Sequence, residues 1–120
     1  MIRILLVDDR ADFRQAFTAL LEGQPDLEVV GTAGSLAEGR TMLQGVDVAL
    51  LDRGLPDGDG LDLIGELRAA NPDARVFVIS STEEEIHPTD AIEAGADGVI
   101  DKFDTPERVF AAIRERGHGA

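Results

Sequence analysis

The chain has 120 residues, the length of one ordinary domain, and a formal net charge of −13. This charge disfavours direct binding to DNA or RNA, which requires a basic surface. The absence of cysteine excludes disulfides, thiolate nucleophiles and cysteine-ligated metals. No apolar run approaches the roughly 20 residues that span a bilayer, so we expect a cytoplasmic protein without membrane contact.

Short apolar runs alternate with amphipathic segments along the chain. Residues 2–7 (IRILLV) predict a strand, and residues 10–23 carry apolar side chains at helical spacing. A second strand is predicted at 27–33. The segment 35–45 opens with the Ser-x-x-Glu pattern of a capping box and predicts a helix.

The second half of the chain repeats this alternation, and its predicted elements are strands at 46–51, 75–80 and 97–101 and helices around 63–67, over 88–95 and from Pro106 onward. Thr105 is the expected N-cap of the last helix. Residues 114–120 are expected to fray. Several strands are almost continuously apolar, which is typical of strands covered on both faces. Five β-α units therefore predict a doubly wound α/β domain with a parallel sheet.

Polar residues follow four of the predicted strands, at the carboxyl edge where ligands bind in such a sheet. In chain order, these residues are Asp8 and Asp9, then Asp52, then Ser80, then Asp101 and Lys102. A single aspartate after a strand is more often a turn former or a helix cap. The joint arrangement indicates a site, because neighbouring strands would bring carboxylates, a hydroxyl and an ammonium into one pocket.

The carboxylates of Asp8, Asp9 and Asp52 cannot all remain ionised together without a cation. Two carboxylates about 5 Å apart repel by about 3 kcal/mol at an effective dielectric constant near 20. Oxygen ligands without histidine or cysteine favour Mg²⁺ or a similar hard ion. An aspartate beside such an ion is prepared to act as a nucleophile in phosphoryl transfer. Lys102, the only lysine of the chain, would neutralise charge on the transferred group.

The sequence resembles the receiver domain of two-component response regulators over nearly its whole length. The segments that carry the likeness are ILLVDD, DVALLDRGLPDGDGLDLI, RVFVIS, AGADGVIDK and TPERVFAAI. The resemblance is strongest to the NarL/FixJ subfamily. It implies a flavodoxin-like α/β fold of five parallel strands in the order 2-1-3-4-5 with five helices. Residues 1–120 would form a single receiver domain, with no output domain present.

The resemblance also implies the phosphorylation site and its metal ligands. Asp52 would accept a phosphoryl group from a phosphohistidine on a sensor histidine kinase. Asp9 would bind Mg²⁺ most directly and Asp8 would assist through water. Asp52 itself and the backbone carbonyl of Gly54 would complete the set of protein ligands.

The response to phosphorylation is implied in the same way. Ser80 and Lys102 would each contact a phosphoryl oxygen, and their movement would change the surface of the fourth helix, fifth strand and fifth helix, through which a homodimer is expected. Val99 stands where the family often has an aromatic switch residue, and Phe103 stands where a proline commonly follows the lysine. Pro88 falls where the fourth helix often already runs. These departures concern the output surface and not the phosphorylation chemistry.

Other interpretations start from the same residues. A haloacid-dehalogenase-type phosphatase also uses an aspartate nucleophile with Mg²⁺, but it requires Asp-x-Asp where this chain has Asp8-Asp9-Arg10. A receiver-like module that is never phosphorylated would not need the complete set of polar residues. A flavin site lacks a Trp or Tyr to stack on the ring. We therefore expect a signalling domain and not an enzyme. This domain would control transcription through a DNA-binding domain outside this chain. Alternatively, it would act as a stand-alone receiver on a protein partner.

Overall fold

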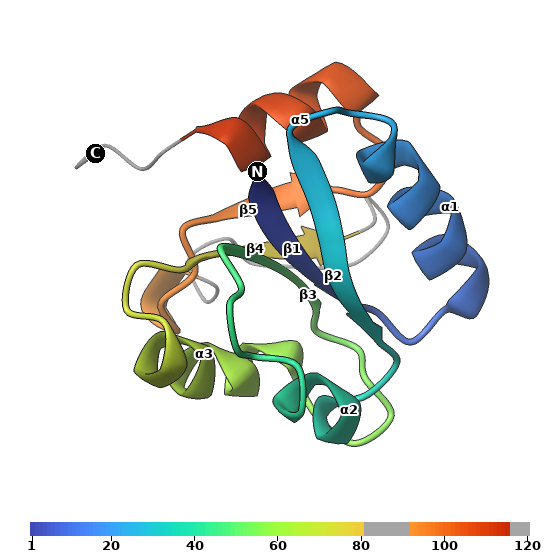
Figure 1. Cartoon of the computed structure of the whole chain (residues 1–120). Helices are drawn as coiled ribbons and strands as arrows, with labels where there is room; N and C mark the ends of the chain where they lie inside the picture. Colours follow the sequence, from blue (N-terminus) through green and yellow to red (C-terminus); the bar gives the residue numbers. More distant parts are fainter. Residues whose placement is uncertain (81–91, 116–120) are drawn as a thin grey trace.

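The computed structural model describes residues 1–80 and 92–115. Five parallel strands form one sheet in the order β2-β1-β3-β4-β5 (Figure 1). The strands are β1 (Ile2–Val7), β2 (Leu27–Ala33), β3 (Val48–Asp52), β4 (Arg75–Ser80) and β5 (Gly98–Asp101). This order confirms the predicted doubly wound α/β fold.

Helices cover both faces of the sheet, with α1 and α5 on one face and α2 and α3 on the other (Figure 1). Their bounds are α1 (Ala11–Glu22), α2 (Leu36–Arg40), α3 (Ile64–Ala70) and α5 (Pro106–Arg114), and a 3₁₀ turn, η1 (Gly60–Leu63), leads into α3. Residues 88–91 of the predicted helix over 88–95 lie outside the described residues. Within the two described ranges, none of the helices is both long and apolar enough to cross a membrane.

The central strands are apolar on both faces because each face packs against its own layer of helices. In β1, Leu5 and Val7 belong to the apolar cluster on the α2 and α3 side. Ile4 and Leu6, which alternate with them, belong to the cluster on the α1 and α5 side. All four side chains are fully buried. A slip of one residue would exchange the two faces, so this packing fixes the register and the side chains that reach the carboxyl edge.

Strand β3 begins later than predicted and extends to Asp52. The sequence predicts a strand over 46–51, but Asp47 is bonded through both its backbone and its side chain to Arg3, whose N–H donates to Asp47 Oδ2 at 2.9 Å. The strand therefore starts at Val48. Asp52 is the last residue of the strand and pairs in register with Ile79 of β4.

Helix α2 is shorter than the predicted segment 35–45. Its N-cap is as predicted, because the Ser35 hydroxyl accepts a hydrogen bond from the N–H of Glu38 at 3.2 Å. The Thr41 hydroxyl donates to the carbonyl of Glu38 at 2.7 Å, and the helix ends at Arg40. A side-chain hydroxyl that bonds the preceding turn in this way competes with continuation of the helix.

The loop after β3 is tied to the start of α2. The carboxylate of Asp57 accepts hydrogen bonds from the backbone N–H of Leu36 at 2.8 Å and of Ala37 at 3.1 Å. These two bonds lower the pKa of Asp57 below its usual value of 3.8. The loop that carries the chain away from Asp52 is thus held against the α2 side of the sheet.

Helix α5 begins as predicted, with the Thr105 hydroxyl accepting a backbone hydrogen bond at 3.4 Å, but its end does not fray at residue 114. The Arg114 guanidinium donates two hydrogen bonds of 2.7 Å to Asp26 and one of 2.8 Å to Gln24. The expectation of a fraying end is therefore wrong for Arg114, while residues 116–120 lie outside the described ranges.

Gly60, the first residue of η1, packs directly on the backbone of Asp52. A Cβ at this position would overlap the Asp52 carbonyl oxygen and lie 3.3 Å from the Cβ of Leu51. Both obstructing residues belong to a central strand that is held on each side. Only glycine allows the loop to return this closely to the end of β3.

We predict that Gly60→Ala lowers the free energy of unfolding by about 4 kcal/mol or more, because the clash is with backbone and cannot relax cheaply. Gly65→Ala is the matched control, since a Cβ on Gly65 meets nothing within 4 Å. Removing this helical glycine should stabilise the protein by up to about 1 kcal/mol. Urea denaturation followed by circular dichroism measures both changes, and equal stability of the two variants would contradict the packing described.

Candidate functional site

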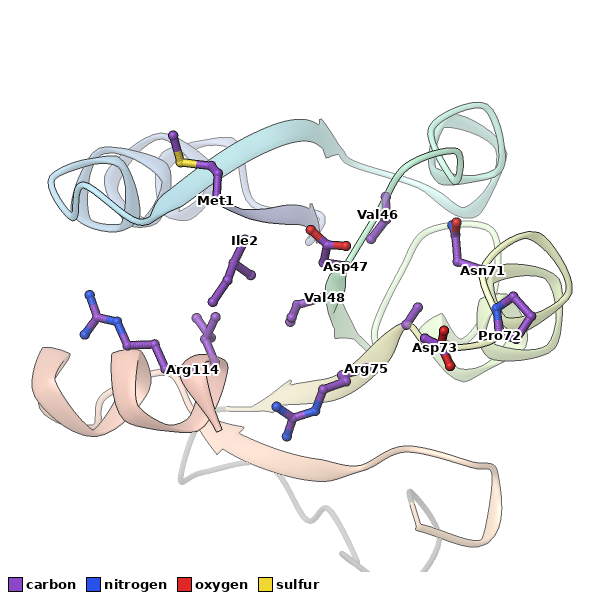
Figure 2. A pocket seen from close by; sticks show the side chains of 12 residues that line it. Met1, Ile2, Val46, Asp47, Val48, Asn71, Pro72, Asp73, Arg75 and Arg114 are labelled. Carbon is purple, nitrogen blue, oxygen red and sulfur yellow. The ribbon is translucent and has the colours of Figure 1, made fainter. Parts of the chain in front are cut away.

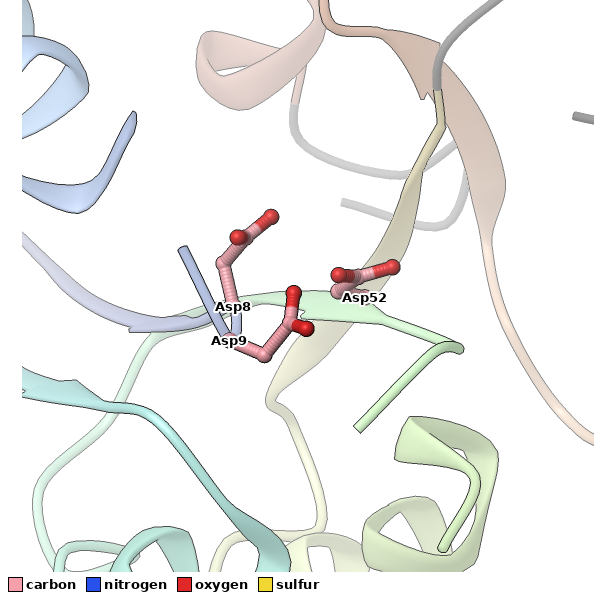
Figure 3. A group of neighbouring side chains, drawn as sticks. All are labelled: Asp8, Asp9 and Asp52. Carbon is pink, nitrogen blue, oxygen red and sulfur yellow. The ribbon is translucent and has the colours of Figure 1, made fainter. Parts of the chain in front are cut away.

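Three carboxylates converge at the carboxyl ends of β1 and β3 (Figure 3). Val7 pairs with Leu51, so the residues that follow them, Asp8 and Asp52, come next to each other at the edge of the sheet. Asp9 follows directly, and one oxygen from each of the three carboxylates lies within 4.8 Å of the others. The parallel register therefore brings together the acidic residues that the sequence singles out.

Two of these carboxylates are buried, and each accepts a backbone hydrogen bond. Asp8 is fully buried and Asp52 is 3% exposed, whereas Asp9 is exposed. The N–H of Arg10 donates to Asp8 Oδ1 at 2.8 Å, and the N–H of Gly54 donates to Asp52 Oδ1 at 3.2 Å. Burial of a carboxylate is costly unless it is both hydrogen-bonded and neutralised. These bonds meet the first requirement, and a nearby cation must meet the second.

Lys102 supplies positive charge to both buried carboxylates. Its Nζ lies 2.7 Å from Asp8 Oδ2 and 3.7 Å from Asp52 Oδ2. Both contacts are ion pairs, and the one with Asp8 is the closer of the two. The side chain of Lys102 is only 9% exposed. The ammonium is therefore held inside the pocket, closer to Asp8 than to Asp52.

Ser80 and Gly54 lie at the same edge of the sheet. Ser80 ends β4 and is 8% exposed, and its carbonyl accepts a hydrogen bond of 2.6 Å from the N–H of Lys102. Ser80 follows Ile79, the residue of β4 that pairs with Asp52. The six residues proposed from the sequence thus lie at the ends of four strands or within two residues of them.

A cavity of about 540 Å³ opens at this edge, and Asp9, Asp52, Gly54 and Lys102 contribute to its wall. A second cavity, of about 510 Å³, lies at the opposite end of the sheet, where the strands begin (Figure 2). None of the residues proposed for the site lines the second cavity. Since doubly wound sheets bind ligands beyond the carboxyl ends of their strands, the first cavity is the candidate site.

The donor set of this pocket fits a hard divalent cation. Asp8, Asp9 and Asp52 offer carboxylate oxygens only, which is the ligand chemistry of Mg²⁺ and Ca²⁺. Asp9 is exposed and can reach an ion from the solvent side, while the other two carboxylates are fixed by the fold. The cluster can therefore hold a metal ion at the mouth of the cavity.

Two further residues support the site, and the sequence alone indicates a role there for neither of them. Arg14 donates a hydrogen bond of 2.5 Å from Nη1 to the carbonyl of Asp8. The ring of Phe13 lies beneath the Lys102 ammonium, with its centroid 4.8 Å from Nζ. In the sequence, Phe13 is one of the apolar residues at helical spacing within 10–23. Its position four residues after Asp9, in the first turn of the following helix, was the available signal for a place near the site.

Residues 4–114 match the family described as the response regulator receiver domain. Since this match covers most of the 120 residues, the chain belongs to that family. Receiver domains of response regulators are signalling domains that interact with histidine kinases. The resemblance inferred from the sequence is confirmed.

Several relatives are NarL-type regulators, as the sequence predicts. The chain is 37% identical, over 99% of its length, to the DNA-binding transcriptional activator DevR/DosR of Mycobacterium tuberculosis. It is 31% identical, over 97% of its length, to the nitrate/nitrite response regulator protein NarL of Escherichia coli. It covers 56% and 55% of these two proteins, so it spans about half the length of the curated relatives it matches.

Solved structures agree with this assignment. The signal receiver domain of the putative response regulator NarL from Mycobacterium tuberculosis superposes with a TM-score of 0.80 at 28% identity, covering 96% of this chain and 98% of that one. The fold, the acidic pocket and the relatives together define a receiver domain of a two-component response regulator.

We predict that Asp9→Asn stabilises the metal-free protein, because it relieves repulsion among three neighbouring carboxylates. The gain in the free energy of unfolding should be on the order of 1 kcal/mol, since Asp9 is exposed and its charge is screened by solvent. Addition of a divalent cation should then raise the melting temperature of the wild type more than that of the variant.

Asp12→Asn is the matched control for this experiment. Asp12 lines the same cavity and its side chain is 75% exposed, but it pairs with Arg10 and is not part of the carboxylate cluster. Its removal should not stabilise the metal-free protein. A loss of stability in Asp9→Asn in the presence of a chelator would show that the three carboxylates do not repel one another as described.

Proposed function

We propose that this domain accepts a phosphoryl group on Asp52 from a phosphohistidine of a sensor histidine kinase. The observation that carries the proposal is the position of Asp52, which ends a central strand, is 3% exposed, and lies between two further carboxylates and the Lys102 ammonium. It also borders an open cavity through which a donor can approach. Membership of the receiver family supports the same conclusion.

Asp8, Asp9, Asp52 and the backbone carbonyl of Gly54 are the proposed protein ligands of Mg²⁺. Asp9 would bind the ion directly from the exposed side of the cluster, and Asp8 would assist through water. When bound, the ion supplies positive charge for the oxygens of the transferred group. The three carboxylates within 4.8 Å of one another support this assignment, because they need a counter-charge greater than one lysine provides.

Lys102 and Ser80 are the proposed partners of the transferred group. The Lys102 ammonium, 3.7 Å from an Asp52 oxygen, would exchange part of its pairing with Asp8 for a phosphoryl oxygen. The Ser80 hydroxyl would donate a hydrogen bond to a second phosphoryl oxygen. The N–H of Gly54, which already donates to Asp52 Oδ1, helps to hold the attacking carboxylate in place.

In the proposed transfer, the phosphoryl group passes from the phosphohistidine to Asp52. A carboxylate oxygen of Asp52 attacks the phosphorus, a P–O bond forms, and the P–N bond of the donor breaks. The bonding pair stays on the imidazole, which takes up a proton. Asp52 needs no general base because its carboxylate is already the nucleophile.

The proposed output is transcriptional control through a DNA-binding domain outside residues 1–120, with these residues forming a single receiver domain in the cytoplasm. The transcriptional regulators among the relatives support this output. The surface that responds would comprise the fourth predicted helix (88–95) with β5 and α5, and two copies could associate through it. Val99 on β5 replaces the family's usual switch aromatic, so the response would not use a turning ring.

The two alternative functions considered from the sequence differ in whether the protein keeps or releases the phosphoryl group. A stand-alone receiver acting on a protein partner would have the same chemistry at Asp52. A haloacid-dehalogenase-type phosphatase would release phosphate repeatedly, and the spacing Asp8-Asp9-Arg10 does not support it. We propose a signalling domain without enzymatic turnover, apart from slow loss of its own phosphoryl group.

We predict that incubation with acetyl phosphate and Mg²⁺ adds one phosphoryl group to the chain, as measured by intact-mass spectrometry. Asp52→Asn should show no gain, because the amide is not a nucleophile, and a chelator should abolish the gain in the wild type. Asp59→Asn is the matched control, since Asp59 lies in the loop after Asp52 and pairs with Arg53. Labelling of Asp52→Asn to the extent of the wild type would refute the proposed acceptor.

A further inference from the structure

The Lys102 ammonium rests over the face of an aromatic ring. Its Nζ lies 4.8 Å from the centroid of Phe13, while Asp8 and Asp52 approach the same nitrogen at 2.7 and 3.7 Å. A cation within about 6 Å of a ring face is attracted by the negative quadrupole of the ring. We propose that Phe13 is a positioning residue, whose ring holds the Lys102 ammonium in the pocket between Asp8 and Asp52.

The flexible Lys102 side chain has two carboxylate partners at different distances, and the ring of Phe13 would restrain its position. Lysine carries a compact charge on a four-carbon stem, and two carboxylates on one side do not fix where the charge sits. The Lys102 side chain is 9% exposed, so its ammonium has lost most of its water, and the attraction to a ring grows as a cation is desolvated. The ring of Phe13 closes the pocket on the side of α1.

The ring is itself held in place by the core. Phe13 stacks on Phe17, with the ring centroids 5.0 Å apart and the planes inclined by 22°. Phe17 is 5% exposed and belongs to the apolar cluster between the sheet and helices α1 and α5. Through Phe17, the core therefore supports the ring over which the ammonium lies. Leucine at position 13 would keep the packing on Phe17 but would remove the quadrupole.

If Asp52 is the phosphoryl acceptor, as proposed above, the Phe13 ring should also affect the rate of phosphoryl transfer. Lys102 must meet a phosphoryl oxygen on Asp52, and Phe13 keeps the ammonium within 3.7 Å of an Asp52 oxygen before the donor arrives. Ordering a group in advance lowers the entropic part of the barrier. Loss of the ring should therefore slow phosphorylation without abolishing it.

Placement of the ammonium can be tested without metal or phosphodonor. Because Lys102 is the only lysine, protein labelled with ¹³C-lysine gives a single set of lysine side-chain NMR signals. Protons above a ring face are shifted upfield by the ring current. We expect upfield Lys102 ε-CH₂ protons in the wild type and in Phe13→Tyr, which keeps a ring. In Phe13→Leu these protons should move to the position of an exposed lysine.

The rate of phosphorylation by acetyl phosphate and Mg²⁺ gives the second measurement. Phe13→Leu should lower this rate by about tenfold, and Phe13→Tyr should stay within about twofold of the wild type. Phe110→Leu is the matched control, because it removes a ring from the same apolar cluster, where the ring lies under Arg114 and not under Lys102. Its Lys102 signals and its rate should equal those of the wild type at temperatures where it is folded.

The two measurements separate the inference from the function on which it rests. Unshifted Lys102 protons in the wild type, or protons that do not respond to Phe13→Leu, would overturn the role of Phe13. Equal slowing by Phe110→Leu and Phe13→Leu would also overturn it, because a general loss of packing would then explain both. If the wild type takes up no phosphoryl group, the proposed function fails, and the NMR signals alone decide the placement of Lys102.

Discussion

The repulsion among three carboxylates at one edge of the sheet is the constraint on which the rest of the site depends. Asp8 and Asp52 are buried and Asp9 lies beside them, with their oxygens within 4.8 Å of one another. Lys102 compensates one charge and sits closer to Asp8 than to Asp52. Three carboxylates and one ammonium together carry a formal excess of negative charge. Such an arrangement is unfavourable by itself and becomes favourable when a cation enters.

The fold explains why this unfavourable arrangement persists. Alternation along β1 divides its side chains between two apolar clusters, and this packing fixes the parallel register that delivers Asp8 beside Asp52. Gly60 then allows the loop after β3 to return against the Asp52 backbone. The packing of the apolar core thus keeps the carboxylates of Asp8 and Asp52 together against their mutual repulsion. The core therefore maintains the geometry of the pocket for which we propose metal and phosphoryl binding.

The sequence predicted the strands well where a strand is a continuous apolar run with clear ends. Strands β1, β2 and β4 have the predicted bounds, whereas β3 is displaced because Asp47 bonds to Arg3 before the strand begins. Helix α2 is shorter than its amphipathic segment because a threonine hydroxyl bonds the preceding turn. These differences come from side-chain hydrogen bonds, which apolar periodicity does not register.

The acidic residues and Lys102 could be proposed from sequence because parallel strands place their ends at one edge. The position of Phe13 beside Lys102 could not be proposed from the sequence, because an aromatic residue on the apolar face of a helix predicts core packing. Only the structure shows that a cation lies over its ring. Burial values likewise required the structure. They distinguish Asp8 and Asp52, which are enclosed, from Asp9, which remains open to solvent.

The central claim is tested most directly by a crystal structure of the chain with Mg²⁺ and beryllofluoride, an analogue of the phosphoryl group. We predict that beryllium bonds to a carboxylate oxygen of Asp52, that the ion contacts the carboxylates of Asp9 and Asp52, and that Lys102 Nζ leaves its position 2.7 Å from Asp8 to contact a fluorine. Beryllofluoride bound away from Asp52, or Lys102 still paired with Asp8 in the complex, would contradict the account.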